Sequence, residues 1–130
     1  MAHLVRPSVE TVEWVYDALL PFAGIFNWTG GTIAEGNDSG LAIAADVLGR
    51  PDDADRHSDD AIALCERAGA RVYLARANLD RGRMFADRGD SSSARPYVET
   101  AIAIGEATGM TGPFGLVTRG ADLLASLDAG

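Results

Sequence analysis

The chain has no lysine, only one cysteine and no long apolar run. Its 11 basic residues, all arginines, stand against 19 acidic residues, for a net charge of −8 at pH 7. Because phosphate recognition requires concentrated basic side chains, this balance argues against nucleic-acid binding by this chain. Cys65 has no second cysteine with which to pair, which indicates a free thiol in a reducing compartment.

Targeting and membrane-spanning patterns are also missing. Residues 1–7 contain no apolar core of the kind that a signal peptide requires. No stretch approaches the roughly 18 consecutive apolar residues of a membrane-spanning helix. We therefore expect a cytoplasmic protein that does not contact a membrane. The hydrophobic fraction of 47% in 130 residues is typical of one folded domain with a modest core.

Strand-like alternation is absent, whereas helical spacing of apolar residues recurs along the chain. Ser8 is a good cap for a first helix, which Pro21 and Gly24 end. Residues 22–40 are too apolar for a free linker, so we expect an ordered connection that packs on the core and contains a helical turn. The fold class is predicted to be all-α. Further helices are expected over 41–48, from Asp52 to Gly69, over 71–88, from the serines at 91–93 to Gly109 with Pro96 in the first turn, and over 114–127.

One apolar segment occurs twice, and other residues recur at the same offset. Ala61-Ile62-Ala63-Leu64, followed by Gly69, returns as Ala101-Ile102-Ala103-Ile104, followed by Gly109. The same offset pairs Gly49 with Gly89, Ala54 with Ala94 and Glu66 with Glu106. A period between about 20 and 50 residues is typical of stacked repeats. We expect a single domain, 1–130, divided into an amino-terminal helix and connection (1–40), two repeats (41–69 and 70–110) and a terminal helix (111–130).

The small residues of these units resemble those of tetratricopeptide repeats, where they allow close helix approach. The period is longer than the roughly 34 residues of that repeat, and Ser58 stands where a large aromatic residue is usual. Glu66 and Glu106 also replace the usual helix-ending proline. The resemblance implies a tetratricopeptide-like solenoid of about two and a half repeats plus the first helix. The residues that carry it are Gly49, Ala54, Ala61, Gly82, Gly89, Ala94 and Ala101.

A more particular resemblance covers roughly residues 19–110. The segments 19–24, 41–54, 70–76 and 88–90 are similar to the carboxy-terminal repeat array of large bacterial signalling ATPases. That group includes LuxR-type, maltose-regulator-like transcription factors and ATPases linked to nucleotide cyclases. The resemblance implies protein contact or effector sensing within a bacterial regulator, whereas ATP and DNA binding belong to other domains. The chain has no Gly-x-x-x-x-Gly-Lys-Ser/Thr loop, so ATP binding is not expected here.

A partner groove is the first candidate site, for a protein or peptide partner. In stacked helix pairs the first helix of each pair lines a concave face. Arg76 and Arg83 lie two turns apart on such a helix and are suited to a carboxylate or an acidic peptide. The alternative is pairing within the helix, since Asp80 and Asp87 follow these arginines by one helical turn. The predicted groove residues are Ile43, Asp46, Val47, Arg76, Leu79, Arg83 and Asp87.

Two other functions remain open. Trp14, Phe22, Phe26 and Trp28 form either an apolar pocket for a small-molecule effector or part of the core. The last helix carries several leucines and few charges, so it covers the end of the stack poorly. This composition predicts a homodimer through a terminal helix.

No catalytic set is recognisable, and neither enzymatic activity nor a cofactor is expected. The dense acidic run around His57 contains residue types that bind metals. Successive helical residues point in different directions, however, and acidic residues are favoured at a helix start, so we expect a solvated helix face and no metal. The run comprises Asp52, Asp53, Asp55, His57, Asp59 and Asp60.

Overall fold

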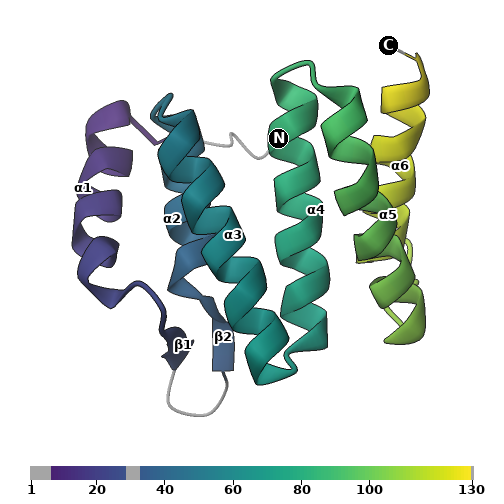
Figure 1. Ribbon diagram of the computed structural model, residues 1–130, viewed down its shortest axis with the longest axis horizontal. Coiled ribbons are helices and arrows are strands. Elements are labelled where there is room, and N and C mark those ends of the chain that lie inside the picture. Colours follow the sequence, from purple (N-terminus) through teal and green to yellow (C-terminus); the bar gives the residue numbers. More distant parts are fainter. Residues whose placement is uncertain (1–6, 29–32, 130) are drawn as a thin grey trace, which may run out of the picture.

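The computed structural model describes residues 7–28 and 33–129 and is mostly helical, which confirms the all-α prediction at the level of fold class. The helices pack in chain order as a curved row (Figure 1). The elements are α1 (Val9–Leu19), a 3₁₀ turn (Leu20–Phe22), β1 (Phe26–Trp28), β2 (Ile33–Gly36), α2 (Asn37–Val47), α3 (Pro51–Ala68), α4 (Arg71–Asp87), α5 (Ser91–Ala107) and α6 (Leu116–Ala129).

The connection between α1 and α2 contains a β-hairpin, which the sequence did not predict. The expected helical turn is present as the 3₁₀ turn, but β1 then pairs antiparallel with β2, with Phe26 opposite Gly36. Strands of three and four residues with an irregular register are too short to show clear alternation. A side chain added at Gly36 would lie 3.1 Å from Leu64 Cδ2, so the hairpin packs closely against α3.

Four turns of the same kind separate the helices from α2 to α6. Gly49, Gly69, Gly89 and Gly109 are evenly spaced along the chain, and each has a positive φ of 65° to 79°. In every turn, the N–H of the residue after the glycine donates to a carbonyl of the last helical turn, as Arg50 does to Ala45 at 2.9 Å. This bond is the mark of the Schellman motif, in which glycine takes the left-handed conformation at least cost.

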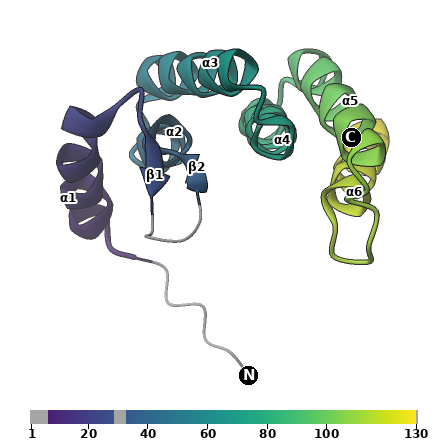
Figure 2. The same cartoon turned by 90° about the horizontal axis from the view of Figure 1, so that it is seen from below.

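The row of helices is curved. Seen from below, α3 and α5 lie on the outer side, whereas α2 and α4 lie on the inner side between α1 and α6 (Figure 2). Two apolar clusters make up the core. One joins α1, α2 and α3, together with Met84 of α4, around Tyr16 and Leu41, and the other joins α4, α5 and α6 around Leu79 and Val98.

Small residues sit where helices approach most closely, as the sequence predicted for Gly82. A Cβ atom at Gly82 would lie 2.5 Å from Val98 Cγ2. The alanines that recur at the fixed sequence offset are buried on α3 and on α5. Ala54 and Ala94 are both fully buried, and Ala61 and Ala101 are no more than 2% exposed.

In the carboxy-terminal half, the start of α5 and the last helix differ from the sequence prediction. Asp90, not a serine, caps α5 by accepting the Ser93 N–H, at 3.0 Å, and this bonding lowers the Asp90 pKa. Pro96 therefore lies beyond the first turn, inside the helix. The last helix begins at Leu116, and Phe114 lies before it with 92% of its surface exposed. Leu116 itself is buried, so α6 covers the second cluster better than its composition suggested.

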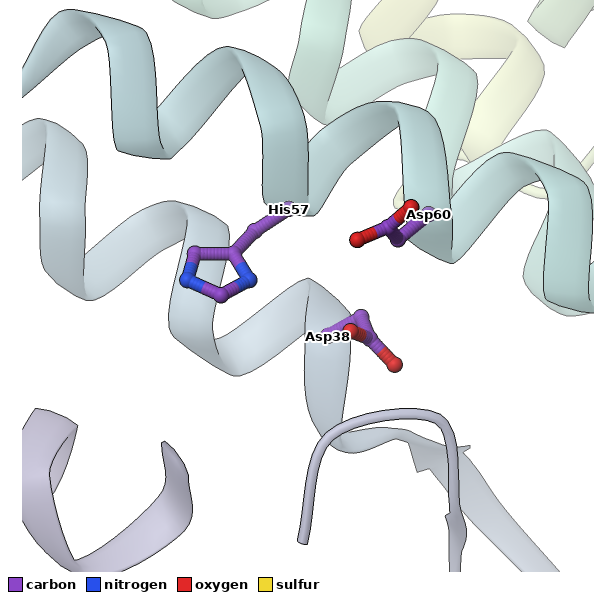
Figure 3. Close-up of side chains that lie close together, drawn as sticks. All are labelled: Asp38, His57 and Asp60. Atoms are coloured by element: carbon purple, nitrogen blue, oxygen red, sulfur yellow. The ribbon is translucent and has the colours of Figure 1, made fainter. Parts of the chain in front are cut away.

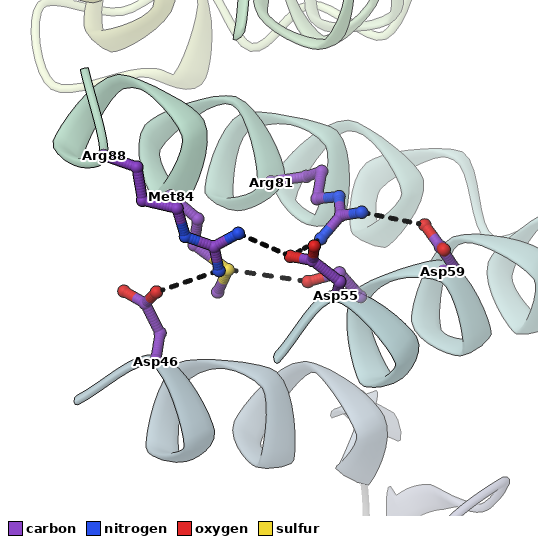
Figure 4. Close-up of polar contacts among 7 residues, drawn as sticks. Asp46, Asp55, Asp59, Arg81, Met84 and Arg88 are labelled. Atoms are coloured by element: carbon purple, nitrogen blue, oxygen red, sulfur yellow. Dashed lines mark hydrogen bonds and ion pairs between the residues drawn. The ribbon is translucent and has the colours of Figure 1, made fainter. Parts of the chain in front are cut away.

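An arginine–carboxylate network joins α2, α3 and α4 (Figure 4). Arg81, 5% exposed, pairs with Asp55 and with Asp59 of α3. Arg88 pairs with Asp55 at 2.8 Å and with Asp46 at 3.3 Å. The Arg81 guanidinium carbon also lies 4.6 Å from the centre of the Phe85 ring, a cation–π contact. These contacts fix α4 against the preceding pair of helices.

Candidate functional site

The inner face carries a cleft of about 240 Å³ between α2 and α4. Five of the seven predicted groove residues lie on its wall, and Asp80 and Met84 complete it. The five are Ile43, Asp46, Val47, Arg83 and Asp87.

Two predicted groove residues lie elsewhere. Leu79 is 1% exposed and packs in the cluster of α4, α5 and α6, so its assignment to the groove was wrong. Leu79 and Arg83 lie about one helical turn apart on a similar side of α4, so packing makes the difference: Leu79 is covered by Val98 of α5 and Leu116 of α6. Arg76 is exposed, but it lies outside the cleft wall and pairs with Glu35 of β2 at 3.6 Å.

The charges of the cleft differ from the predicted arginine pair. Within the described residues, Arg83 and Asp87 form no ion pair with each other or with any other side chain. Asp80 likewise forms no ion pair within those ranges. Burial raises its pKa and Glu35 adds to the rise, whereas Arg76, Arg83 and Arg119 oppose it from beyond ion-pair distance. Asp46 is engaged by Arg88. The described wall of the cleft therefore presents one arginine and two carboxylates that are available to a ligand.

An apolar cleft continues the first one toward α1. Its volume is about 270 Å³, and it shares Ile43 and Val47 with the charged cleft. Val12, Val15 and Ala44 line it as well. Ile43 and Val47 are 42% and 58% exposed, so both aliphatic side chains are accessible from the two clefts that they line. The inner face thus combines an apolar half at α1 and α2 with a charged half at α2 and α4.

The predicted aromatic pocket is not assembled. Trp14 and Phe22 are 71% and 53% exposed, so neither the pocket nor the core interpretation applies to them. Phe26 lies against Tyr73, with ring centres 6.5 Å apart, in an apolar cleft of about 300 Å³ whose described wall includes neither Trp14 nor Phe22. The side chain of Trp28 lies outside the part of the chain that the structure describes.

The acidic run is divided between different environments. Asp52 lies exposed at the start of α3, as expected, whereas Asp55 and Asp59 pair with Arg81. The prediction that His57 lies on a solvated face was wrong, because it is 1% exposed.

His57 has carboxylates beside it that come from two helices. Its ring lies between α3 and α2, close to the carboxylates of Asp38 and Asp60 (Figure 3). Asp60 belongs to the acidic run, but Asp38 lies outside it, in the first turn of α2. The sequence contains no signal that links Asp38 to His57, so only the tertiary structure brings the two together.

Comparison with protein-family models, with curated proteins and with solved structures finds no match to this chain. Within the described residues, no helix combines the length and the apolar character needed to cross a bilayer. The inner face and the buried polar cluster around His57 are therefore the features from which a function can be inferred.

Proposed function

We propose that the inner face of α2 and α4 binds a peptide segment of a partner protein. The observation that carries this proposal is the continuity of the two clefts through Ile43 and Val47. A concave surface with exposed aliphatic anchors and a few unpaired charges suits an extended or helical segment. The chain acts in this proposal as a non-catalytic recognition module.

The charges favour a segment that carries apolar and basic side chains. Asp80 and Asp87 line the cleft, no arginine in the described ranges lies within ion-pair distance of them, and Arg83 is the one basic side chain on the described wall. The net charge of −8 further attracts basic partners over longer distances. An acidic peptide, which the spacing of Arg76 and Arg83 suggested, is less well supported because Glu35 already pairs with Arg76.

We also propose that the helices form a tetratricopeptide-like stack. The pairs α2–α3 and α4–α5, joined by the evenly spaced glycine turns, support a tetratricopeptide-like stack with α6 at its end. The sequence resemblance to bacterial signalling ATPases supports a role in protein contact or effector sensing within a transcriptional or signalling regulator. In such an arrangement the peptide would come from another part of the regulator or from its partner.

A peptide selection tests this function. The purified chain is immobilised and used to select from a random peptide display library, and enriched peptides are then titrated by fluorescence anisotropy. We expect enrichment of sequences with aliphatic side chains next to lysine or arginine. The variant Asp87→Lys, which reverses a charge on the cleft wall, should weaken binding by about tenfold or more, as expected for loss of a charged contact at a recognition site.

Glu66→Lys is the matched control, because it makes the same charge change at an exposed position of α3, the helix that lies on the outer side of the row. It should leave the affinity within about twofold. Val47→Asp should abolish the apolar contribution while the helix content stays unchanged by circular dichroism. Equal losses in Asp87→Lys and Glu66→Lys, or selection without any enriched pattern, would argue against the inner face as a peptide site.

Self-association is a second candidate function, and one observation favours it. Large apolar side chains lie exposed on α1 and the segment after it, in contrast to the better covered α6. Exposed apolar patches of this kind mark association surfaces. The exposed residues are Val9, Trp14, Leu20, Phe22 and Ile25.

A further inference from the structure

His57 lies within the packed interface of α1, α2 and α3, where a polar ring needs partners. Its Nε2 is 3.0 Å from the Tyr16 hydroxyl, and the two rings meet edge to face with centres 5.6 Å apart. Its Nδ1 is buried and has no hydrogen-bond partner within the described residues. Because a buried polar atom without a partner destabilises the folded state, this nitrogen calls for an explanation.

The unpartnered nitrogen faces two carboxylates. Asp60 follows His57 by about one helical turn and therefore lies on the same side of α3, whereas Asp38 comes from the first turn of α2. One donor atom from each of the three residues lies within 4.8 Å of the other two. In Figure 3 one ring nitrogen points toward the carboxylates of Asp38 and Asp60, and the other points away from them.

Asp38 is the second unusual member of this cluster. It is 1% exposed, and its Oδ2 accepts the backbone N–H of Gly24 at 2.7 Å. No arginine within the described ranges pairs with it. A buried carboxylate is strongly disfavoured unless a cation or several donors compensate it. The carboxylate of Asp38 and the free nitrogen of His57 therefore both favour a bound cation.

The geometry makes His57 a ligand for such a cation. Its ring is 1% exposed, its Nε2 bonds to Tyr16, and its Nδ1 is left without a partner among the described residues. A neutral ring that donates its Nε2–H to Tyr16 leaves the Nδ1 lone pair directed at the cluster. This is the arrangement that metal-binding histidines adopt, in which a hydrogen bond from the second nitrogen fixes the tautomer.

We propose that Asp38, His57 and Asp60 bind one divalent transition-metal ion, with Zn²⁺ as the reference ion. One imidazole nitrogen and two carboxylate oxygens form a donor set typical of Zn²⁺ and related ions, whereas Ca²⁺ and Mg²⁺ prefer oxygen ligands alone. Ligand atoms around tetrahedral zinc lie roughly 3.4 Å apart, for bonds of about 2.1 Å. Since the three atoms already lie within 4.8 Å, and Asp60 is exposed, small side-chain rotations bring them to that spacing.

The ion would connect three parts of the amino-terminal half. Asp38 belongs to α2 and is bonded to Gly24 of the connection, while His57 and Asp60 belong to α3. Tyr16 extends the site to α1 through its hydrogen bond to His57. The exposed Asp60 provides the route of entry, and a water from that side would supply the fourth ligand. Metal binding should therefore stabilise the packing of α1 and the connection on α3.

Zn²⁺ binding to the chelator-treated full chain tests this inference. Isothermal titration with ZnCl₂ should show one saturable site per chain, and the melting temperature should rise with the Zn²⁺ concentration. Asp60→Asn should weaken binding at least tenfold without loss of folding, because Asp60 is exposed. Asp52→Asn is the matched control on the same helix and should bind Zn²⁺ as the unchanged chain does.

Co²⁺ provides a readout of the ligands themselves. The chain loaded with Co²⁺ should show visible d–d absorption, and His57→Gln should alter this spectrum and weaken binding even if its stability is lower. Absence of saturable Zn²⁺ and Co²⁺ binding, or equal binding by Asp60→Asn and Asp52→Asn, would overturn the inference. Binding of Ca²⁺ or Mg²⁺ in preference to Zn²⁺ would overturn the assignment to a transition metal.

Discussion

At the scale of single residues, whether a side chain can belong to a surface site depends more on its burial than on its residue type. Leu79 and Arg83 lie one helical turn apart in sequence, but only Arg83 reaches the cleft. His57 lies in a run of acidic residues, yet it is almost completely buried. Helical periodicity gives the relative directions of the side chains on one helix. Which residues each side chain contacts depends on how the helices pack. The groove prediction therefore placed five residues that do lie on the cleft wall, whereas Leu79 is buried and cannot line it.

Asp80 permits a prediction at this scale. Its pKa is raised from 3.8, chiefly by burial, so ionisation is easier in the unfolded chain than in the folded one. Below pH 3.8 the group is protonated in both states and does not change the stability. As the pH rises through the folded pKa, the folded state loses stability relative to the unfolded state. Asp80→Asn should therefore increase the free energy of unfolding at neutral pH, and this gain should vanish toward pH 3.8.

Urea unfolding of both proteins at several pH values measures this difference. Asp17→Asn removes the same charge from an exposed position of α1 and serves as the control. The difference in the free energy of unfolding between Asp17→Asn and the unchanged chain should depend little on pH. A loss of stability in Asp80→Asn at neutral pH would show that the ionised carboxylate makes a favourable contact, for example with Arg83, that outweighs its burial.

At the scale of elements, the glycines have two distinct roles. Those at positions 49, 69, 89 and 109 end helices with positive φ, whereas Gly82 lies inside α4 and permits contact with α5. The turn glycines were recognisable from the sequence because their effect is local. The β-hairpin was not, because its two short strands are stabilised by each other and by packing on α3.

Gly82→Ala tests the close approach of α4 and α5. The added Cβ would lie 2.5 Å from Val98 Cγ2 and 3.2 Å from the Ala94 carbonyl oxygen, so the helices must separate or Val98 must move. We expect a loss of about 1–3 kcal/mol in the free energy of unfolding, as for other overpacked cores. Chemical denaturation monitored by circular dichroism measures it.

Gly40→Ala is the matched control within α2. There the added Cβ would make only an ordinary contact, 3.5 Å from Leu19 Cδ1. Because alanine favours helix over glycine by about 1 kcal/mol, this variant should be neutral or more stable. If the two variants have the same effect, helix propensity rather than packing governs Gly82.

At the scale of the whole molecule, the two ends of the row differ. The carboxy-terminal end is covered by α6, whose Leu116 is buried and whose later leucines are half-buried. The amino-terminal end exposes Trp14 and Phe22. The composition of the last helix predicted a dimer through a terminal helix, and the exposed apolar surface favours α1 for that role.

Light scattering coupled to size exclusion tests this expectation. We expect a homodimer whose fraction falls on dilution and with Trp14→Glu, because a charged side chain would be buried in the interface. Phe114→Glu is the control, since it makes the same kind of change at an exposed aromatic residue before α6. A monomer at high concentration, or dissociation caused equally by both variants, would contradict association through α1.

The sequence alone determined the helices, their approximate ends and the small residues between them. These properties depend on local signals: the glycine turns, the cap at Ser8 and the helical spacing of alanine and leucine. Only the tertiary structure decided that Ile43 and Val47 join two clefts, and that Asp38 meets His57 and Asp60. Those groupings join residues from different helices, and helix packing, which local periodicity does not specify, fixes which faces meet.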